Sequence, residues 1–230
     1  YSSKEEIITN MNPLLKKVIK ENKGNTICDI GCGCGRNLVY ASKYAVQLIG
    51  IDLSATSLAF AKELVESENL ELLVGNNLSI PLGDNIADLV ISDGVCHHTG
   101  DTVGAFNECV RILIPNGKLY LAVYKKISYY PIVYFIIGGI FRLMNKVKIG
   151  NFIIEKLFVN IHYLMYKLFK KQKLTKSETR NIFFDYFITP IATFQSKSDV
   201  HAWANESNCK IVDYARTSGN CHVFIIQKSE

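Results

Sequence analysis

The chain has 230 residues, of which 48% are hydrophobic and 20% are charged. This composition excludes disordered and collagen-like chains, and the length suffices for one large domain with a full hydrophobic core. The seven cysteines are odd in number and scattered, which argues against a disulfide-stapled scaffold and favours reduced thiols in a cytoplasmic protein. The net charge of +5 is uneven: residues 125–180 carry +10, so the rest of the chain sums to −5.

Short apolar runs and stretches with helical apolar spacing alternate along the chain. The expected helices are Lys4–Asn22, Gly35–Lys43, Ser54–Glu66 with Ser54 as N-cap, Val103–Leu113 and Ser198–Glu206. The expected strands are Thr26–Ile30, Val46–Ile51, Leu70–Val74, Ile86–Ser92, Gly117–Val123, Lys210–Tyr214 and His222–Gln227. Such alternation implies right-handed crossovers, so we predict a doubly wound α/β fold around a mostly parallel, seven-stranded sheet.

The alternation stops after Tyr124, and we interpret residues 125–190 as a helical insertion between strands 5 and 6 of a single domain, 1–230. Ile127–Phe141 is an uncharged run of fifteen residues, shorter than the about 20 needed to span a bilayer. An amphipathic, basic helix is expected further on. Its apolar stripe is Ile154, Phe158, Ile161, Met165 and Leu168, and the lysines on or beyond its other faces are Lys156, Lys167, Lys170, Lys171 and Lys173.

The segment from Asp29 to Gly35 reads D-x-G-x-G-x-G directly after the first expected strand. Ligands of open α/β sheets bind beyond the carboxyl ends of the strands, where glycine tolerates positive φ and lets a ligand approach the backbone. A dinucleotide fingerprint would need glycine at Arg36, and no Gly-Lys-Ser/Thr follows as in a P-loop. The loop therefore favours neither NAD nor FAD, nor a triphosphate.

Asp52 ends the second expected strand. A carboxylate at this place can accept two hydrogen bonds from the vicinal hydroxyls of a ribose. Together with Asp29 it disfavours a pyrophosphate and suits a nucleoside linked to an amine. The alternative is that Asp52 merely caps the next helix.

Further segments extend this pattern: Ile27–Arg36, Ile49–Ser54, GNNLSIPL at 75–82, ADLVISD at 87–93, His97-His98 and ECVRILIPNG at 108–117. In this order they resemble the motifs of class I S-adenosylmethionine-dependent methyltransferases, in particular the small-molecule and quinone (methyltransferase type 11) group. The resemblance covers about residues 25–124. It implies S-adenosyl-L-methionine as cofactor and methyl transfer as the activity.

The resemblance also implies roles for single residues. The residues expected against the methionine moiety are Asp29, Gly31, Cys32, Gly33 and Gly35, with Ser92 and Asp93 beside the methionine and the sulfonium. Asp52 would hold the ribose and Leu53 would pack on the adenine. Asn76, followed by Asn77, stands where the family usually has an acid facing the adenine amine, and its amide oxygen can accept the same bond.

His97 and His98 follow the fourth expected strand, on the rim of the expected pocket. Histidine accepts a proton near neutral pH, so both are candidate general bases for a poorly ionised acceptor. The alternative is that one of them orders the loop or faces solvent. Cys28, Cys32 and Cys34 follow C-x3-C-x-C, which is not a zinc or iron–sulfur spacing, so no metal site is expected.

The acceptor contacts are predicted at Tyr124, Tyr130 and Tyr186. An aromatic, cationic insertion suits a lid over a small, partly apolar acceptor. Three alternatives stay open: a basic surface for transfer RNA, as in the wobble-uridine methyltransferases that share this core; a peripheral contact with an anionic membrane by a lipid or quinone methyltransferase; and simple packing or homodimerisation.

Overall fold

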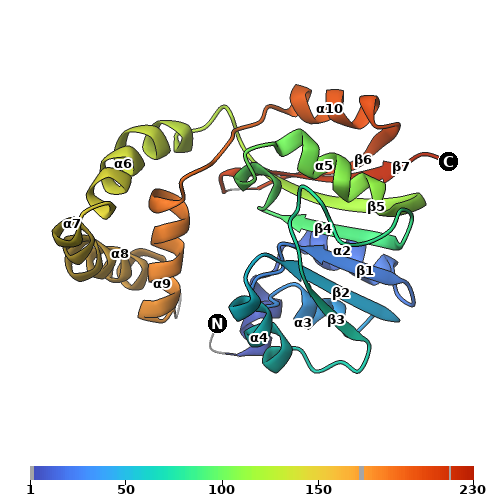
Figure 1. Ribbon diagram of the computed structural model, residues 1–230, viewed down its shortest axis with the longest axis horizontal. Coiled ribbons are helices and arrows are strands. Elements are labelled where there is room, and N and C mark those ends of the chain that lie inside the picture. Colours follow the sequence, from blue (N-terminus) through green and yellow to red (C-terminus); the bar gives the residue numbers. More distant parts are fainter. Residues whose placement is uncertain (1–2, 171–173, 218) are drawn as a thin grey trace. The chain divides into compact units, whose positions relative to one another are not determined.

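The computed structural model describes residues 3–170, 174–217 and 219–230 (Figure 1). Its central element is a seven-stranded sheet with the order β3-β2-β1-β4-β5-β7-β6. The strands are β1 (Thr26–Ile30), β2 (Gln47–Asp52), β3 (Leu70–Val74), β4 (Ala87–Asp93), β5 (Leu113–Tyr124), β6 (Cys209–Arg216) and β7 (Cys221–Lys228). All pairs from β3 to β5 are parallel, and β7 runs antiparallel to both β5 and β6. The predicted doubly wound fold is confirmed.

The strand register decides which side chains meet at the carboxyl edge of the sheet. Asp29 of β1 lies opposite Gly50 of β2 and Ile91 of β4. Asp52 and Asp93 end β2 and β4 at the same edge. Three acidic residues that are far apart in the sequence are therefore collected at one edge by strand pairing alone.

The helices outside residues 127–192 follow the prediction with two corrections. They are α1 (Lys4–Asn10), α2 (Pro13–Glu21), α3 (Leu38–Ala41), α4 (Ala55–Leu64), α5 (Thr102–Arg111) and α10 (Lys197–Glu206), with a 3₁₀ turn, η1 (Cys96–His98). The single helix predicted over Lys4–Asn22 is wrong. The chain breaks at Asn12, whose side chain accepts a hydrogen bond from the Leu14 N–H at 2.9 Å, and α2 restarts with Pro13, which has no N–H to give.

The helix predicted over Gly35–Lys43 is reduced to the four residues of α3, because the preceding glycine loop forms turns. The predicted cap of α4 is confirmed. The Ser54 hydroxyl accepts from the Ser57 N–H at 3.1 Å, so this residue satisfies an otherwise unpaired donor of the first turn.

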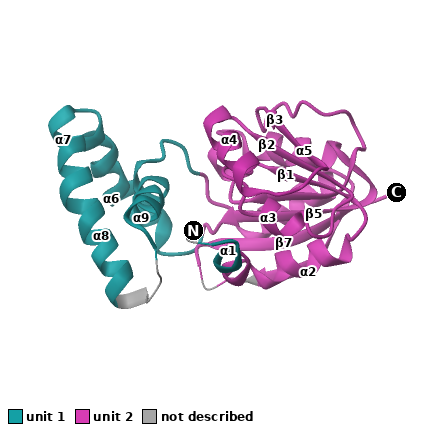
Figure 2. Ribbon diagram, turned by 90° about the horizontal axis from the view of Figure 1, so that it is seen from below, with its two compact units in different colours: residues 1–7, 127–192 teal, residues 8–126, 193–230 magenta. Residues whose placement is uncertain are grey.

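The chain divides into two compact units (Figure 2). The sheet unit comprises residues 8–126 and 193–230, and the helical unit comprises residues 1–7 and 127–192. The main elements of the helical unit are α6 (Tyr130–Asn145), α7 (Lys148–Ile153), η2 (Ile154–Phe158), α8 (Val159–Met165), η3 (Tyr166–Lys170), α9 (Lys176–Phe183) and η4 (Phe184–Ile188). In the described part of the chain, no helix is both long and apolar enough to cross a membrane.

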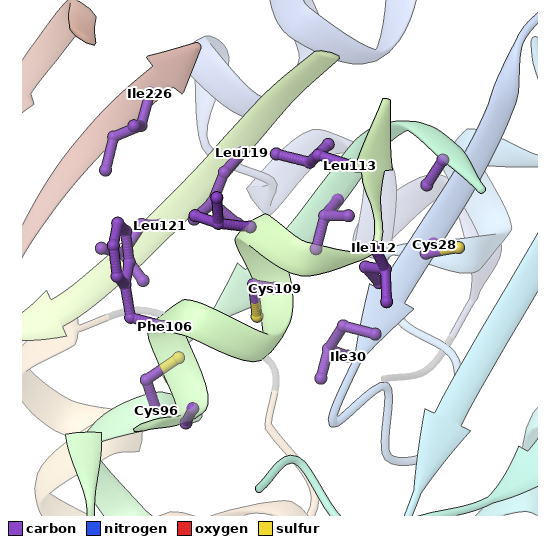
Figure 3. Close-up of a cluster of buried hydrophobic side chains, with 14 of the residues drawn as sticks. Cys28, Ile30, Cys96, Phe106, Cys109, Ile112, Leu113, Leu119, Leu121 and Ile226 are labelled. Atoms are coloured by element: carbon purple, nitrogen blue, oxygen red, sulfur yellow. The ribbon is translucent and has the colours of Figure 1, made fainter. Parts of the chain in front are cut away.

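The core of the sheet unit includes four of the cysteines, Cys28, Cys96, Cys109 and Cys209. Cys28, Cys96 and Cys109 are fully or almost fully buried among the aliphatic side chains around α5, β4 and β5 (Figure 3). Cys32 is also buried, with its sulfur close to the backbone of Gly50. These thiols occupy small volumes in a packed interior.

The helical unit has its own smaller core, formed by Phe141, Ile154, Val159 and Phe183. The stripe predicted over residues 154–168 is only partly correct. Ile154 is buried, whereas Ile161, Met165 and Leu168 are exposed. The π-helical turns η2 and η3 bond i to i+5, so they rotate the following side chains away from the face expected for 3.6 residues per turn. Lys171 and Lys173 lie outside the described residues.

Candidate functional site

Three glycines shape the loop that follows β1. Gly31, Gly33 and Gly35 all have positive φ, at +70°, +52° and +84°. A Cβ on Gly31 would lie 2.5 Å from a methyl carbon of Val95, whereas a Cβ on Gly33 would meet nothing within 4 Å. The loop is therefore packed tightly at its first glycine and has open space at its second.

Asp52 ties this loop to the end of β2. Its Oδ2 accepts from the Gly33 N–H at 2.9 Å, and its Oδ1 accepts from the Ser54 N–H at 2.9 Å. Because Ser54 caps α4, the alternative that Asp52 serves merely as the cap does not hold. Each carboxylate oxygen keeps a second lone pair for a ligand hydroxyl.

Asp29 lies beneath the loop and is almost fully buried. Burial raises the pKa of Asp29 to about 8, against the opposing effect of a hydrogen bond from the Asn37 amide at 3.4 Å, and the Asp93 charge raises it further. Its Oδ2 has no hydrogen-bond partner among the described atoms. A buried carboxyl oxygen without a donor is costly, and a cationic or donor group would remove that cost.

The sheet unit has a cavity of about 430 Å³ at this edge, and ligand sites typically measure about 300–1,000 Å³. Its lining comes from the glycine loop, the end of β2 and the segments after β3 and β4. The lining residues are Gly31, Asp52, Leu53, Asn76, Asn77, Leu78, Gly94, Val95, His98 and Thr99. Leu53 is 69% exposed, so its side chain offers a free apolar surface beside the two asparagines.

The predicted residues separate into two groups. Those that line the cavity are Gly31, Asp52, Leu53, Asn76, Asn77 and His98, whereas Asp29, Cys32, Gly33, Gly35, Ser92, Asp93 and His97 lie outside its lining. Ser92 is buried, and its hydroxyl lies 3.1 Å from the Cys96 sulfur. Asp93 forms an ion pair with Arg36 at 2.6 Å, which joins the glycine loop to the end of β4.

The two histidines differ sharply. His97 is fully buried, and its ring centroid lies 3.8 Å from that of Tyr124. Burial lowers the pKa of His97 well below its ordinary value, and the neighbouring His98 lowers it further. The prediction that His97 lies on the pocket rim is wrong, because the 3₁₀ turn η1 directs it inward. His98 lines the cavity.

Sequence reasoning missed several contributors to this site. Val95 and Thr99 line the cavity, and Asn37 is the hydrogen-bond donor to Asp29. The sequence did offer a signal for these residues, namely their positions: Val95 and Thr99 lie in the segment after β4, and Asn37 lies just after the glycine loop. Arg111 was part of a quoted motif but received no role. It donates to Glu108 at 2.7 Å and to the carbonyls of Leu82 and Ile80, and so fixes the segment that follows the two asparagines.

The tyrosines predicted to contact an acceptor lie in different units. Tyr124 belongs to the sheet unit, where its ring covers His97. Tyr130 and Tyr186 lie in the helical unit, with ring centroids 4.9 Å apart and the Tyr130 hydroxyl donating to the Tyr186 carbonyl at 2.9 Å. They line a second cavity of about 300 Å³, together with Tyr129, Val133, His162, Met165, Tyr166 and Phe187.

Among the described residues, no group of three or more His, Cys, Asp or Glu side chains is placed to hold a metal ion. The cysteines of the glycine loop are separated by burial, since Cys28 and Cys32 are buried and Cys34 is exposed. The loop is therefore organised by glycine geometry.

Comparison with known proteins relates part of the chain to a known family. Residues 28–121 match the model of a methyltransferase domain. A probable tRNA methyltransferase 9B of Bos taurus is 34% identical over 116 residues, which are 49% of this chain and 24% of that protein. Norajmaline N-methyltransferase of Rauvolfia serpentina is 30% identical over 107 residues, 44% of this chain and 37% of that protein. The chain thus spans well under half the length of these relatives.

The whole fold is similar to that of an S-adenosylmethionine-dependent methyltransferase from Mesorhizobium loti. That crystal structure superposes with a TM-score of 0.64 at 14% identity, over 94% of this chain and 96% of the other. At this identity the likeness concerns the fold, which is Rossmann-like in both proteins.

Proposed function

We propose that the chain transfers a methyl group to a small, partly apolar acceptor bound by the helical unit. Methyl transfer follows from residues 28–121, which belong to the class I S-adenosylmethionine-dependent methyltransferases. S-Adenosyl-L-methionine is the cofactor of this family. The observation that carries the acceptor class is the second cavity, whose lining is aromatic and apolar except for His162. Planar apolar molecules bind such a lining through burial and ring contacts.

The residues of the sheet unit fit the cofactor. The open space above Gly33 admits a ligand to the backbone, and the unpartnered Oδ2 of Asp29 suits the ammonium of the methionine moiety. Asp52 would accept from the ribose hydroxyls while keeping its bonds to the loop, and Leu53 would cover the adenine. When bound, the cofactor supplies an activated methyl group on a sulfonium.

The chain's own contribution is to bind, to orient and to exclude water. Where the acceptor atom carries a proton, His98 is the candidate base, because it lines the cavity of the sheet unit that is assigned to the cofactor. His97 is buried against Tyr124 and is held neutral, so its role is to fix the loop that presents His98.

Transfer RNA is the second candidate acceptor. It is favoured by the relatives described as probable tRNA methyltransferases and by the +10 charge of residues 125–180. RNA binding by this segment would weaken steeply with salt, because each neutralised phosphate releases counterions.

Calorimetry with S-adenosylhomocysteine tests the cofactor site. We expect Asp52→Ala to weaken binding by about 10–100-fold, since two hydrogen bonds to a charged acceptor are lost. Asp213→Ala is the matched control. Asp213 lies on β6, outside the lining of the cofactor cavity, and pairs with Lys17 of α2. Its removal should change the affinity for S-adenosylhomocysteine less than about twofold. Undiminished affinity in Asp52→Ala would refute the site assignment.

Transfer of labelled methyl groups to a panel of planar apolar amines and phenols, and to bulk tRNA, tests the acceptor. We expect turnover with a member of the small-molecule panel and an increase of about tenfold in its KM for Tyr186→Ala, with unchanged binding of S-adenosylhomocysteine. Phe152→Ala is the control, because this exposed ring lies outside the second cavity. Transfer to tRNA alone would replace the small-molecule proposal with its rival.

A further inference from the structure

Helix α6 is apolar on both of its faces. Its inner face buries Tyr130, Tyr134, Gly138 and Phe141 within the helical unit. The two tyrosine hydroxyls donate to the carbonyls of Tyr186 and Thr189, at 2.9 and 3.0 Å, so even the polar atoms of this face are used internally. The inner face of α6 is therefore held to η4 and to Thr189 by these hydrogen bonds.

The outer face of α6 carries five large apolar side chains at helical spacing. They are between 57% and 69% exposed, and they are Ile132, Phe135, Ile136, Ile140 and Leu143. Helices that are hydrophobic all round are normally covered on all sides, and a contiguous exposed apolar stripe marks an interaction surface. None of these five residues lines the second cavity, so the proposed acceptor site does not account for them.

The charges around this outer face are positive. Lys146 and Lys148 are exposed where α6 gives way to α7. Arg142 turns inward, donates to the Tyr134 carbonyl at 3.0 Å and stands over the Tyr134 ring. The acid Glu155 is paired with Arg180. Lys146 and Lys148 are therefore exposed cationic groups at this end of α6, whereas the nearby acid Glu155 is paired within the unit.

We propose that the outer face of α6, with Lys146 and Lys148, docks the chain on the surface of an anionic lipid bilayer. The sixteen residues of α6 are too few to cross a bilayer, but an apolar stripe with lysines at its end suits a helix that lies in the interface plane. Each lysine near an anionic surface strengthens binding, whereas a second copy of the chain would present the same positive charges and no complementary negative ones on this face. Charge complementarity therefore selects the lipid surface as the occupant.

Co-sedimentation of the full chain with lipid vesicles tests this proposal. We expect binding to vesicles of phosphatidylcholine mixed with phosphatidylglycerol, much weaker binding to phosphatidylcholine alone, and loss of binding at high salt. The variant Phe135→Ser/Ile136→Ser should bind at least about tenfold more weakly, and Lys146→Gln/Lys148→Gln should lose about fivefold for each lysine. Phe60→Ser, which removes an equally exposed ring from α4 in the sheet unit, should bind as the parent does.

Circular dichroism and the affinity for S-adenosylhomocysteine should be unchanged in all of these variants, which separates this proposal from the proposed function. Absence of vesicle binding by the parent, or equal binding by the Phe135→Ser/Ile136→Ser variant, would overturn it. So would a concentration-dependent dimer in sedimentation velocity that the same double variant abolishes without any effect of lipid, since the occupant would then be a second copy.

Discussion

The sheet unit and the helical unit each have an apolar core, but they differ in where their other polar and apolar side chains lie. In the sheet unit, parallel strands bury their apolar residues on both faces and leave carboxylates at one edge, where Asp52 and the cavity lie. In the helical unit, polar groups such as the Tyr130 and Tyr134 hydroxyls and the Glu155–Arg180 pair hold helices together, while large apolar side chains face outward.

This difference indicates where specificity is encoded. The sheet unit positions its ligand groups through backbone register and glycine geometry, which many sequences can satisfy, and the matched family segment 28–121 lies within it. The helical unit lies outside that segment and is built from side-chain contacts, which are free to differ between relatives. In the proposed function, the sheet unit binds the cofactor and the helical unit binds the acceptor.

Removing the central ring of the helical core should have the largest effect, because it should destabilise the helical unit and leave the sheet unit intact. Phe141 packs on Phe158, Phe183 and Phe187, with centroid distances of 4.8, 5.1 and 5.6 Å. We expect Phe141→Ala to lower the free energy of unfolding of the helical unit by about 3–5 kcal/mol, because a buried aromatic side chain leaves a cavity. Denaturation followed by circular dichroism measures the loss, and the affinity for S-adenosylhomocysteine should persist.

Phe135→Ala is the matched control, because Phe135 lies on the same helix with its ring exposed. Its stability should stay within about 0.5 kcal/mol of the parent. Loss of cofactor affinity together with helicity in Phe141→Ala would show that the two units unfold as one cooperative body, and the comparison would fail.

A methyl group on Gly31, the first glycine of the loop, should lower the stability of the sheet unit and its affinity for the cofactor. Gly31→Ala would combine a φ of +70° with a Cβ overlapping Val95, so we expect a loss of about 2–4 kcal/mol in stability and weaker binding of S-adenosylhomocysteine. In Gly31→Ala/Val95→Ala the two closest contacts, to the Val95 methyl carbons, are removed and only the Cβ at 3.1 Å remains, so part of the loss should be recovered. Gly83→Ala, whose new methyl meets only ordinary contacts, is the control for chemical denaturation and calorimetry.

Much of the fold follows from local patterns, and the failures have local physical causes. The bounds of β1 and β3 equal the predicted ones, because each is a short apolar run between turn residues. The break at Asn12–Pro13 was missed because the apolar spacing continues across it, although an Asx cap followed by proline is itself a start signal. The π turns of the helical unit carry no comparable signal, so the exposed half of its stripe could not be foreseen.

The site was predictable as far as backbone position determines it. Asp52, Leu53 and Asn76 line the cavity because strand ends converge at one edge. Which of two adjacent histidines turns inward depends on the 3₁₀ turn after Gly94 and on the stacking of Tyr124, a contact between residues far apart in the sequence. No periodicity in the sequence distinguishes His97 from His98 before that contact exists.

The proton on Asp29 tests whether the sheet unit binds an ammonium group. Its pKa is raised to about 8 in the folded chain, whereas an unfolded aspartate titrates near about 4. Between these values the folded state holds a proton that the unfolded state has released, so Asp29 lowers stability as the pH rises from about 4 to 8.

A ligand ammonium favours the ionised carboxylate of Asp29, so binding below pH 8 should release this proton. The affinity for S-adenosylhomocysteine should therefore rise with pH, by at most about tenfold per unit, between about pH 6 and 8. Asp29→Asn should bind more weakly and lose this slope, while Asp213→Asn should keep it. Calorimetry in buffers of different ionisation enthalpy counts the released protons, and an equal count in Asp29→Asn would assign the proton to another group.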